Sequence, residues 1–225
     1  MGSAAIIIHE SVKDPHSELW FAEPAGFTAL PLDALLAKPE TPDADKLRVA
    51  AAPLLNLAPN GMARQQFVAL IASGQQMLAT LCDFGTVHCS IGLHRDDVGG
   101  PARGGAQQPL LSLFTISWRD TNVAPRAVTA ARTVTAGEGH TDIAFQELPC
   151  GPAVLSETTH RPAADSGLPQ QPILQIHAHL PHPDCKRLAV LTLSTTATAR
   201  GEEYRAILRQ VAETVRFEEP LGADS

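Results

Sequence analysis

Two consecutive apolar runs with a period of two residues constrain the fold of this chain more than any other feature. The runs "ILQIHAHL" (173–180) and "RLAVLTLSTTAT" (187–198) flank the short connection "PHPDCK". Successive side chains of a β-strand point to opposite faces of the sheet, so the first run has one apolar face and one polar face. Proline and aspartate in the connection favour a turn. The sequence therefore predicts a hairpin of two long antiparallel strands whose apolar face lies on a hydrophobic core.

Other segments predict further strands of the same sheet. The segment "TVHCSIGLH" (86–94) alternates, and "LLSLFTISW" (110–118) is apolar on both faces, as is typical of a central strand. We expect these two strands to be antiparallel and joined by a flexible loop, because residues 96–109 are rich in glycine and proline. Two more strand pairs are predicted from the remaining pattern: a hairpin over 142–160, and a strand, a turn at Gly26 and a second strand over 18–32.

Helical spacing of apolar residues occurs in two places. Residues 43–82 repeat apolar side chains at three- and four-residue steps and predict two helices separated by "LAPNG". Residues 201–217 predict a helix that packs on the sheet, with one apolar stripe. That stripe consists of Tyr204, Ile207, Leu208, Val211 and Val215. The segment "PRAVTAARTVT" (125–135) is left open between a short helix and an exposed connector. Together the elements predict one α+β domain over 1–225, an antiparallel sheet flanked by helices.

Two segments resemble the Mog1/PsbP-like α/β family. They are "GFTALPLDAL" (26–35) near the start and "LAVLTLSTTATARGEEYRAILRQVAETVRF" (188–217), in which Phe217 closes the terminal helix. The resemblance implies an antiparallel sheet with helices packed against it, and residues 43–82 then form a helical insertion. It also implies functions that are diverse and mostly non-catalytic, such as binding a small GTPase, docking on a photosystem or holding a secreted partner.

Charge and composition narrow the classes of partner. The chain has 17 Lys and Arg against 24 Asp and Glu, a net charge of −7, which excludes the basic footprint of a nucleic-acid binder or of a protein on an anionic membrane. The apolar run in the N-terminal stretch "MGSAAIIIHESVKDP" is too short for a signal peptide or a membrane span. We therefore expect a soluble, cytoplasmic protein of bacterial type. Its cysteines are expected to be reduced thiols, although one disulfide is left open: Cys82, Cys89, Cys150 and Cys185.

The segment "QIHAHLPHPDC" (175–185) contains the main candidate site. On a strand, His177 and His179 share one face about 6.5–7 Å apart, a spacing at which two imidazoles can hold one metal ion. The pattern lacks the later glutamate of a cupin and the spacing of a metallo-β-lactamase. We therefore expect Gln175, His177 and His179 to face solvent or a partner and to form a binding surface. The alternative is a metal site of His177, His179 and His182, or with Asp184 or His160 as the third ligand.

Other chemical patterns are incomplete. The loop "GEGHTD" (137–142) groups Glu138, His140 and Asp142, but such loop residues are usually solvated. "GGPARGG" matches neither the P-loop nor the dinucleotide fingerprint. The chain has no Gly-x-Ser-x-Gly elbow. No catalytic residue and no cofactor is therefore predicted.

These observations predict a non-catalytic module that binds another protein, as a chaperone or an adaptor does. The sequence does not identify the partner, and homo-oligomers are left open. The first alternative is a metal-dependent enzyme or metal-binding protein that uses the His177 and His179 pair. The second alternative is a protein that binds a small apolar ligand between the helical insertion and the sheet.

Overall fold

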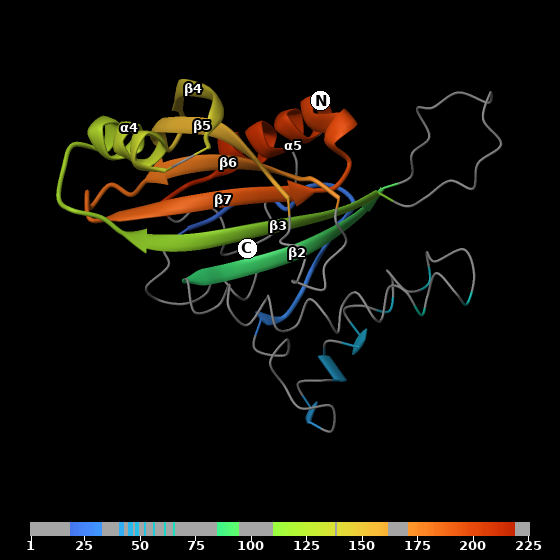
Figure 1. The fold of residues 1–225 in the computed structure, drawn as a ribbon. Helices are drawn as coiled ribbons and strands as arrows, with labels where there is room; N and C mark the ends of the chain where they lie inside the picture. Colours follow the sequence, from blue (N-terminus) through green and yellow to red (C-terminus); the bar gives the residue numbers. More distant parts are fainter. Residues whose placement is uncertain are drawn as a thin grey trace, which may run out of the picture.

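The described residues form an antiparallel sheet with helices on both of its faces (Figure 1). The computed structural model describes residues 19–32, 41–42, 45–46, 48–49, 52, 56, 61, 65, 85–94, 110–137, 139–161 and 171–218. Seven strands lie in the order β1-β2-β3-β7-β6-β5-β4. They are β1 (Phe27–Ala29), β2 (Thr86–His94), β3 (Leu110–Asp120), β4 (Thr141–Leu148), β5 (Gly151–His160), β6 (Ile173–Pro181) and β7 (Arg187–Thr195). Two α-helices, α4 (Arg126–Ala136) and α5 (Gly201–Thr214), and the 3₁₀ turn η2 (Thr198–Arg200) complete the described elements.

The hairpins expected from alternation are confirmed. β6 pairs with β7 and β4 pairs with β5, each antiparallel, and β2 pairs antiparallel with β3. The central position of β3 is confirmed too, because it pairs with β2 on one side and β7 on the other. Its residues Phe114 and Ile116 are completely buried.

The strand pair predicted over 18–32 is only partly correct. Gly26 does form the turn, with a φ of 81°, and β1 follows it. The residues before the turn do not pair with β1, because Trp20 exchanges two backbone hydrogen bonds with Arg216, each of 2.9 Å. Leu19 and Phe21, on either side of Trp20, are buried in the core. The segment therefore anchors the chain beyond α5.

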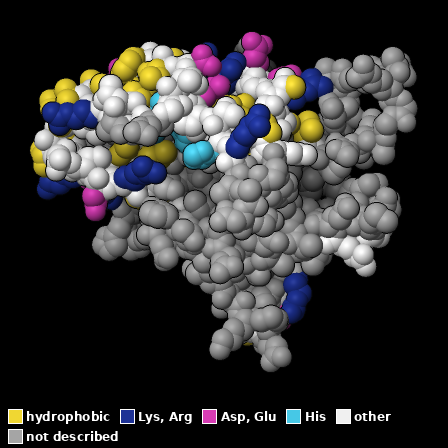
Figure 2. Space-filling model, in the orientation of Figure 1, with side chains coloured by type: hydrophobic (Ala, Val, Ile, Leu, Met, Phe, Trp, Pro, Cys, Tyr) yellow, Lys and Arg dark blue, Asp and Glu magenta, His cyan; other side chains and the backbone are white. Residues whose placement is uncertain are grey.

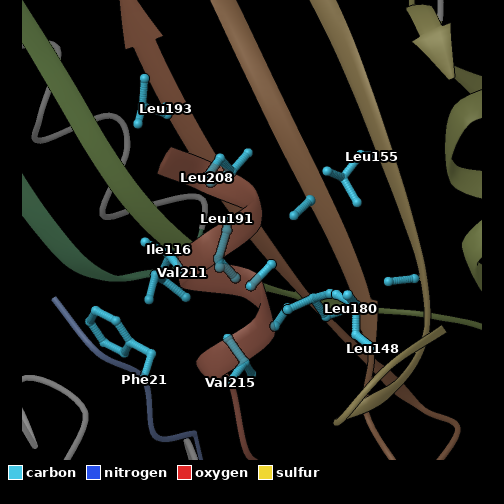
Figure 3. Packing of buried hydrophobic residues seen from close by; sticks show 14 of the residues in the cluster. Phe21, Ile116, Leu148, Leu155, Leu180, Leu191, Leu193, Leu208, Val211 and Val215 are labelled. Atoms are coloured by element: carbon cyan, nitrogen blue, oxygen red, sulfur yellow. The ribbon is translucent and has the colours of Figure 1, made fainter. Parts of the chain in front are cut away.

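The core lies between α5 and one face of the sheet, which we call the first face (Figure 3). Helix α5 directs Leu208 and Val211 onto it, as its apolar stripe predicts, and Val215 follows directly after the helix. Leu155, Leu191 and other alternate strand residues meet them from the sheet. A partly exposed ion pair lies at the side of this layer, because the Arg205 guanidinium on α5 binds the buried Glu157 carboxylate on β5. The pair fixes the helix against the sheet.

Helix α4 packs on the opposite, second face of the sheet. Its Ala130 and Val134 contact Val154 on β5, whose neighbours Ala153 and Leu155 belong to the core on the first face. The helix begins after Pro125, the N-cap residue, whose carbonyl accepts hydrogen bonds from the Val128 and Thr129 amides. Proline is tolerated here because its missing N–H donor has no partner at the start of a helix. The segment left open between helix and connector is therefore a helix. Its β-branched residues are tolerated because the packing on β5 stabilises it.

Two predicted segments fall largely outside this description. Between 43 and 82 the described residues, among them Asp45, Val49 and Gln65, are helical, and the rest lie outside the described residues. The loop predicted over 96–109 lies outside them as well. Within the described part, Cys89, Cys150 and Cys185 are free thiols. No helix among the described residues is long and apolar enough to cross a membrane.

Truncation of Leu208 tests the packing of α5. Leu208→Ala should lower the free energy of unfolding by about 2–5 kcal/mol, because its side chain is completely buried and would leave a cavity. The measurement is urea denaturation followed by circular dichroism. Gln210→Ala on the exposed side of the same helix should change the free energy by less than about 0.5 kcal/mol. Equal effects of the two substitutions would contradict this placement of the helix.

Candidate functional site

The polar face of β6 is largely covered by other parts of the protein. The predicted alternation is confirmed, since Leu174, Ile176, Ala178 and Leu180 join the core of the first face. His177 and His179 lie on the second face, where β6 pairs with β5 through His179 opposite Val154. Because α4 packs on β5 and β6 there, the expectation that these rings face solvent is wrong for His179, which is 3% exposed. His177 is partly buried, and only a few histidine atoms reach the surface in Figure 2.

A third imidazole joins this pair. His140, in the loop after α4, places its ring centroid 5.5 Å from that of His177 and 5.7 Å from that of His179. The His177 and His179 rings are themselves 5.8 Å apart. The three rings form a nearly equilateral cluster, which we call the histidine cluster. The expectation that the loop histidine is simply solvated therefore missed its contact with the sheet.

Gly137 makes room for His140. A Cβ atom at position 137 would lie 2.7 Å from the Cδ2 and Nε2 atoms of the His140 ring. Any other residue at this position would push the ring away from the sheet. The glycine at the end of α4 is the sequence signal for this contact, but it becomes informative only once the position of the helix is known.

Hydroxyl groups from the neighbouring strands bind most of the ring nitrogens. The Ser156 hydroxyl on β5 lies 2.9 Å from His140 Nδ1 and 3.2 Å from His179 Nε2. His177 lies between two threonines, with Nδ1 3.1 Å from the Thr192 hydroxyl and Nε2 3.1 Å from the Thr158 hydroxyl. The cluster is therefore tied to β5, β6 and β7 at once.

The remaining predicted site residue extends the same network. Gln175 donates through Nε2 to the Ser194 hydroxyl on β7, at 3.2 Å. Its position two residues before His177 places it on the second face as well. One atom is left over: His179 Nδ1 is buried and has no hydrogen-bond partner among the described residues. A buried polar nitrogen of this kind is a place where a water molecule or a ligand would be favourable.

Burial keeps the cluster neutral at pH 7. It lowers the pKa of His177 from 6.5 to about 4 and that of His179 to about 3, with the neighbouring imidazoles and Arg119 acting in the same direction. The pKa of His140 is also lowered, first by burial and then by Arg119. A neutral imidazole has one donor and one acceptor nitrogen, and a hydroxyl can serve either. The hydroxyls can therefore bind the neutral rings in either tautomer.

The third ligands proposed for a metal site do not lie beside this pair. The His182 ring instead packs against Phe217 at 4.9 Å and Trp118 at 5.6 Å. Asp184 pairs with Arg187 in the turn between β6 and β7, and His160 is exposed at the end of β5. Over the ranges that the structure describes, no three or more His, Cys, Asp or Glu side chains are placed so that they could hold a metal ion. The nitrogens of the histidine cluster are directed at hydroxyls of separate residues instead.

The chemistry open to this arrangement is limited by access. A serine hydroxyl between two imidazoles has the partners that a nucleophile requires. Ser156, however, is 1% exposed, so a substrate could not reach its oxygen without displacement of α4 or His140. The geometry favours a structural network that holds the loop after α4 against the sheet.

Exposed apolar side chains gather elsewhere, around α4 and β4 (Figure 2). Among the described residues, five large hydrophobic side chains are exposed, and four of them lie between residues 123 and 145. We call these four the α4–β4 surface: Val123 (74% exposed), Val128 (39%), Ile143 (44%) and Phe145 (63%). The sequence pattern predicts a hairpin strand over residues 142–149 but does not predict that this strand lies at the edge of the sheet. The sequence signal for this exposed surface is the pair of apolar residues Ile143 and Phe145, which alternate with the residues on the face of Leu148.

The histidine cluster predicts a specific loss of stability in acid. Because the folded-state pKa values of His177 and His179 lie below the unfolded value of 6.5, the unfolded chain takes up protons first as the pH falls. The contribution of the neutral rings is complete above pH 6.5 and is lost as the pH falls toward 4 and then 3. Urea denaturation at pH 7 and pH 5 should show a loss of roughly 2 kcal/mol for each ring.

A matched pair of variants assigns this loss to the cluster. His179→Gln should give a shallower fall of stability between pH 7 and pH 5 than the unchanged protein. His160→Gln, at an exposed histidine on β5, should follow the unchanged protein. If the stability of His179→Gln fell as steeply between pH 7 and pH 5 as that of His160→Gln, the histidine cluster would not be the source of the acid sensitivity.

Removal of the Ser156 hydroxyl tests the network directly. Ser156→Ala should lower the free energy of unfolding at pH 7 by about 1–3 kcal/mol, because His140 Nδ1 and His179 Nε2 lose a buried partner. Thr196→Ala, at an exposed hydroxyl after β7, should have little effect. If Ser156→Ala left the free energy of unfolding unchanged, the two hydrogen bonds would contribute nothing to stability.

Comparison with known proteins gives no relative from which a function could be transferred. No protein-family model, no curated protein and no solved structure matches this chain.

Proposed function

We propose that this chain is a non-catalytic binding module that contacts another protein through the α4–β4 surface. The observation that carries the proposal is the concentration of exposed apolar side chains there, with Phe145 63% exposed on an edge strand. An apolar group of this kind, rimmed by charged residues, marks interaction sites on protein surfaces. Arg132 on α4 and Glu147 on β4 are exposed beside it.

The α4–β4 surface fits a partner better than the polar face of β6 does. Gln175, His177 and His179 stay predicted contact residues, but His179 is buried and the other two are engaged in hydrogen bonds. A partner that replaced these bonds would gain little, because it would have to displace groups that are already satisfied. The metal-binding alternative has the same difficulty, since metal ligation through either ring nitrogen would require His177 to give up one of its two threonine partners.

We also propose a Mog1/PsbP-like fold, a cytoplasmic location and a protein partner for this chain. An antiparallel sheet with helices packed on it supports a Mog1/PsbP-like fold, a family whose functions are mostly non-catalytic. The free thiols of Cys89 and Cys150 support a location in the reducing cytoplasm. The net charge of −7 supports a protein partner rather than a nucleic acid or an anionic membrane.

Charge placed on the α4–β4 surface tests the proposal. Phe145→Lys should abolish the retention of partner proteins from an extract of the native host, because an ammonium group would have to be desolvated in the contact. Val49→Lys is the matched control, since Val49 is 73% exposed outside this surface. Both variants should keep the circular dichroism spectrum and the unfolding midpoint of the unchanged protein. If the unchanged protein, Phe145→Lys and Val49→Lys all retained the same set of proteins, the proposed surface would be refuted.

A further inference from the structure

We infer that the free edge of β4 accepts an extended segment of the partner as an added antiparallel strand, with the pattern basic–x–apolar–x–apolar. The inference rests on the proposed function and specifies how the contact is made. Strand addition to a sheet edge uses backbone hydrogen bonds for affinity and alternate side chains for specificity.

The position of β4 in the sheet supplies the edge. Within the described residues, β4 is hydrogen-bonded to β5 on one side and ends the sheet on the other. The register shifts between Thr141 and Ala144, and Asp142, inside this bulge, has a φ of 48°. A bulge bends an edge strand and interrupts its pairing. Regular pairing therefore starts at Ala144, directly after Ile143, and the part that could accept a strand is short.

The side chains along this part of β4 alternate between the two faces of the sheet. Phe145 lies opposite Val154 and Glu147 opposite Pro152, so both belong to the second face. Ile143 is the last residue of the bulge and directly precedes Ala144, which lies opposite Leu155 of the first face, so alternation directs Ile143 to the second face. Helix α4 packs on β5 and β6 of that face, and the exposure of Phe145 and Ile143 shows that β4 extends beyond its cover. A strand added beside β4 would cover both apolar side chains.

The charge of β4 selects the chemistry of the added segment. The strand carries Asp142 and Glu147 and no lysine or arginine. Asp142 is engaged by Arg205 at 3.7 Å, and among the described residues no ion pair is recorded for Glu147. A basic residue opposite Glu147 would therefore be favoured, with apolar residues opposite Phe145 and Ile143. In an antiparallel segment these three positions follow one another as basic–x–apolar–x–apolar.

A second copy of this chain fits the same edge less well. It would bring another strand with two acidic residues and no basic residue, on a protein that already carries a net charge of −7. Like charges on paired strands oppose association. The antiparallel direction is preferred because every strand pair of the described sheet is antiparallel.

Peptide binding with exchanged charges tests the register. Fluorescein-labelled peptides TTKTVTVTT and TTETVTVTT are titrated with the full chain up to about 1 mM, since so short a contact is weak. The lysine peptide should bind the unchanged protein about two- to fivefold more tightly than the glutamate peptide, as a cross-strand ion pair allows. Glu147→Lys should reverse this preference, and Phe145→Lys should abolish binding of both peptides. Equal binding of the two peptides, or no reversal, would overturn the inference.

Backbone methylation separates strand addition from simple apolar contact. Two versions of the lysine peptide carry N-methyl groups on alternate residues, one set on each edge of the strand. One version should lose binding at least about tenfold and the other should keep it, because only one edge faces β4. Equal loss or equal retention would overturn strand addition.

The outcomes also separate this inference from the proposed function. Failure of all peptides, with partner retention still lost in Phe145→Lys, would refute strand addition and leave the α4–β4 surface standing. A dimer seen by light scattering in the unchanged protein and lost in Phe145→Lys would identify a second copy as the occupant and overturn the inference. Loss of neither retention nor peptide binding in Phe145→Lys would refute the proposed function itself.

Discussion

Burial of β6 on both faces is the constraint on which the rest of this structure depends. Its apolar side chains pack against α5 on the first face. On the second face, α4 and His140 largely cover its polar side chains. A polar group removed from water must find a partner, so Ser156, Thr158 and Thr192 supply hydroxyls to the imidazole nitrogens. The low pKa values of His177 and His179 follow from the same burial.

This constraint also decides which side chains of the described sheet remain exposed. The residues with the richest chemistry in the sequence are drawn inward and bound to one another, which leaves them little capacity for a partner. The sheet, in contrast, is wider than the helix that covers its second face. Phe145 and Ile143 on β4 remain exposed for that reason, on the strand that ends the sheet within the described residues.

Much of the fold could be predicted from local patterns. The β6–β7 and β4–β5 hairpins and helix α5 followed from periods of two and 3.6 residues, because one face of each element had to be buried. The N-terminal strand pair could not be predicted, since Trp20 pairs with Arg216, far along the chain. The segment 125–135 remained ambiguous because its composition fits a helix or a connector equally well, and contact with Val154 decided the outcome.

The sequence by itself determined that Leu174, Ile176, Ala178 and Leu180 share one face of a strand and that His177 and His179 share the other. Tertiary structure alone decided what lies on that second face. The position of α4 and the gap left by Gly137 bring His140 onto the sheet, although it is distant from both rings along the chain. Alternation fixes the side on which a residue points, but only packing between distant segments fixes whether that side meets water.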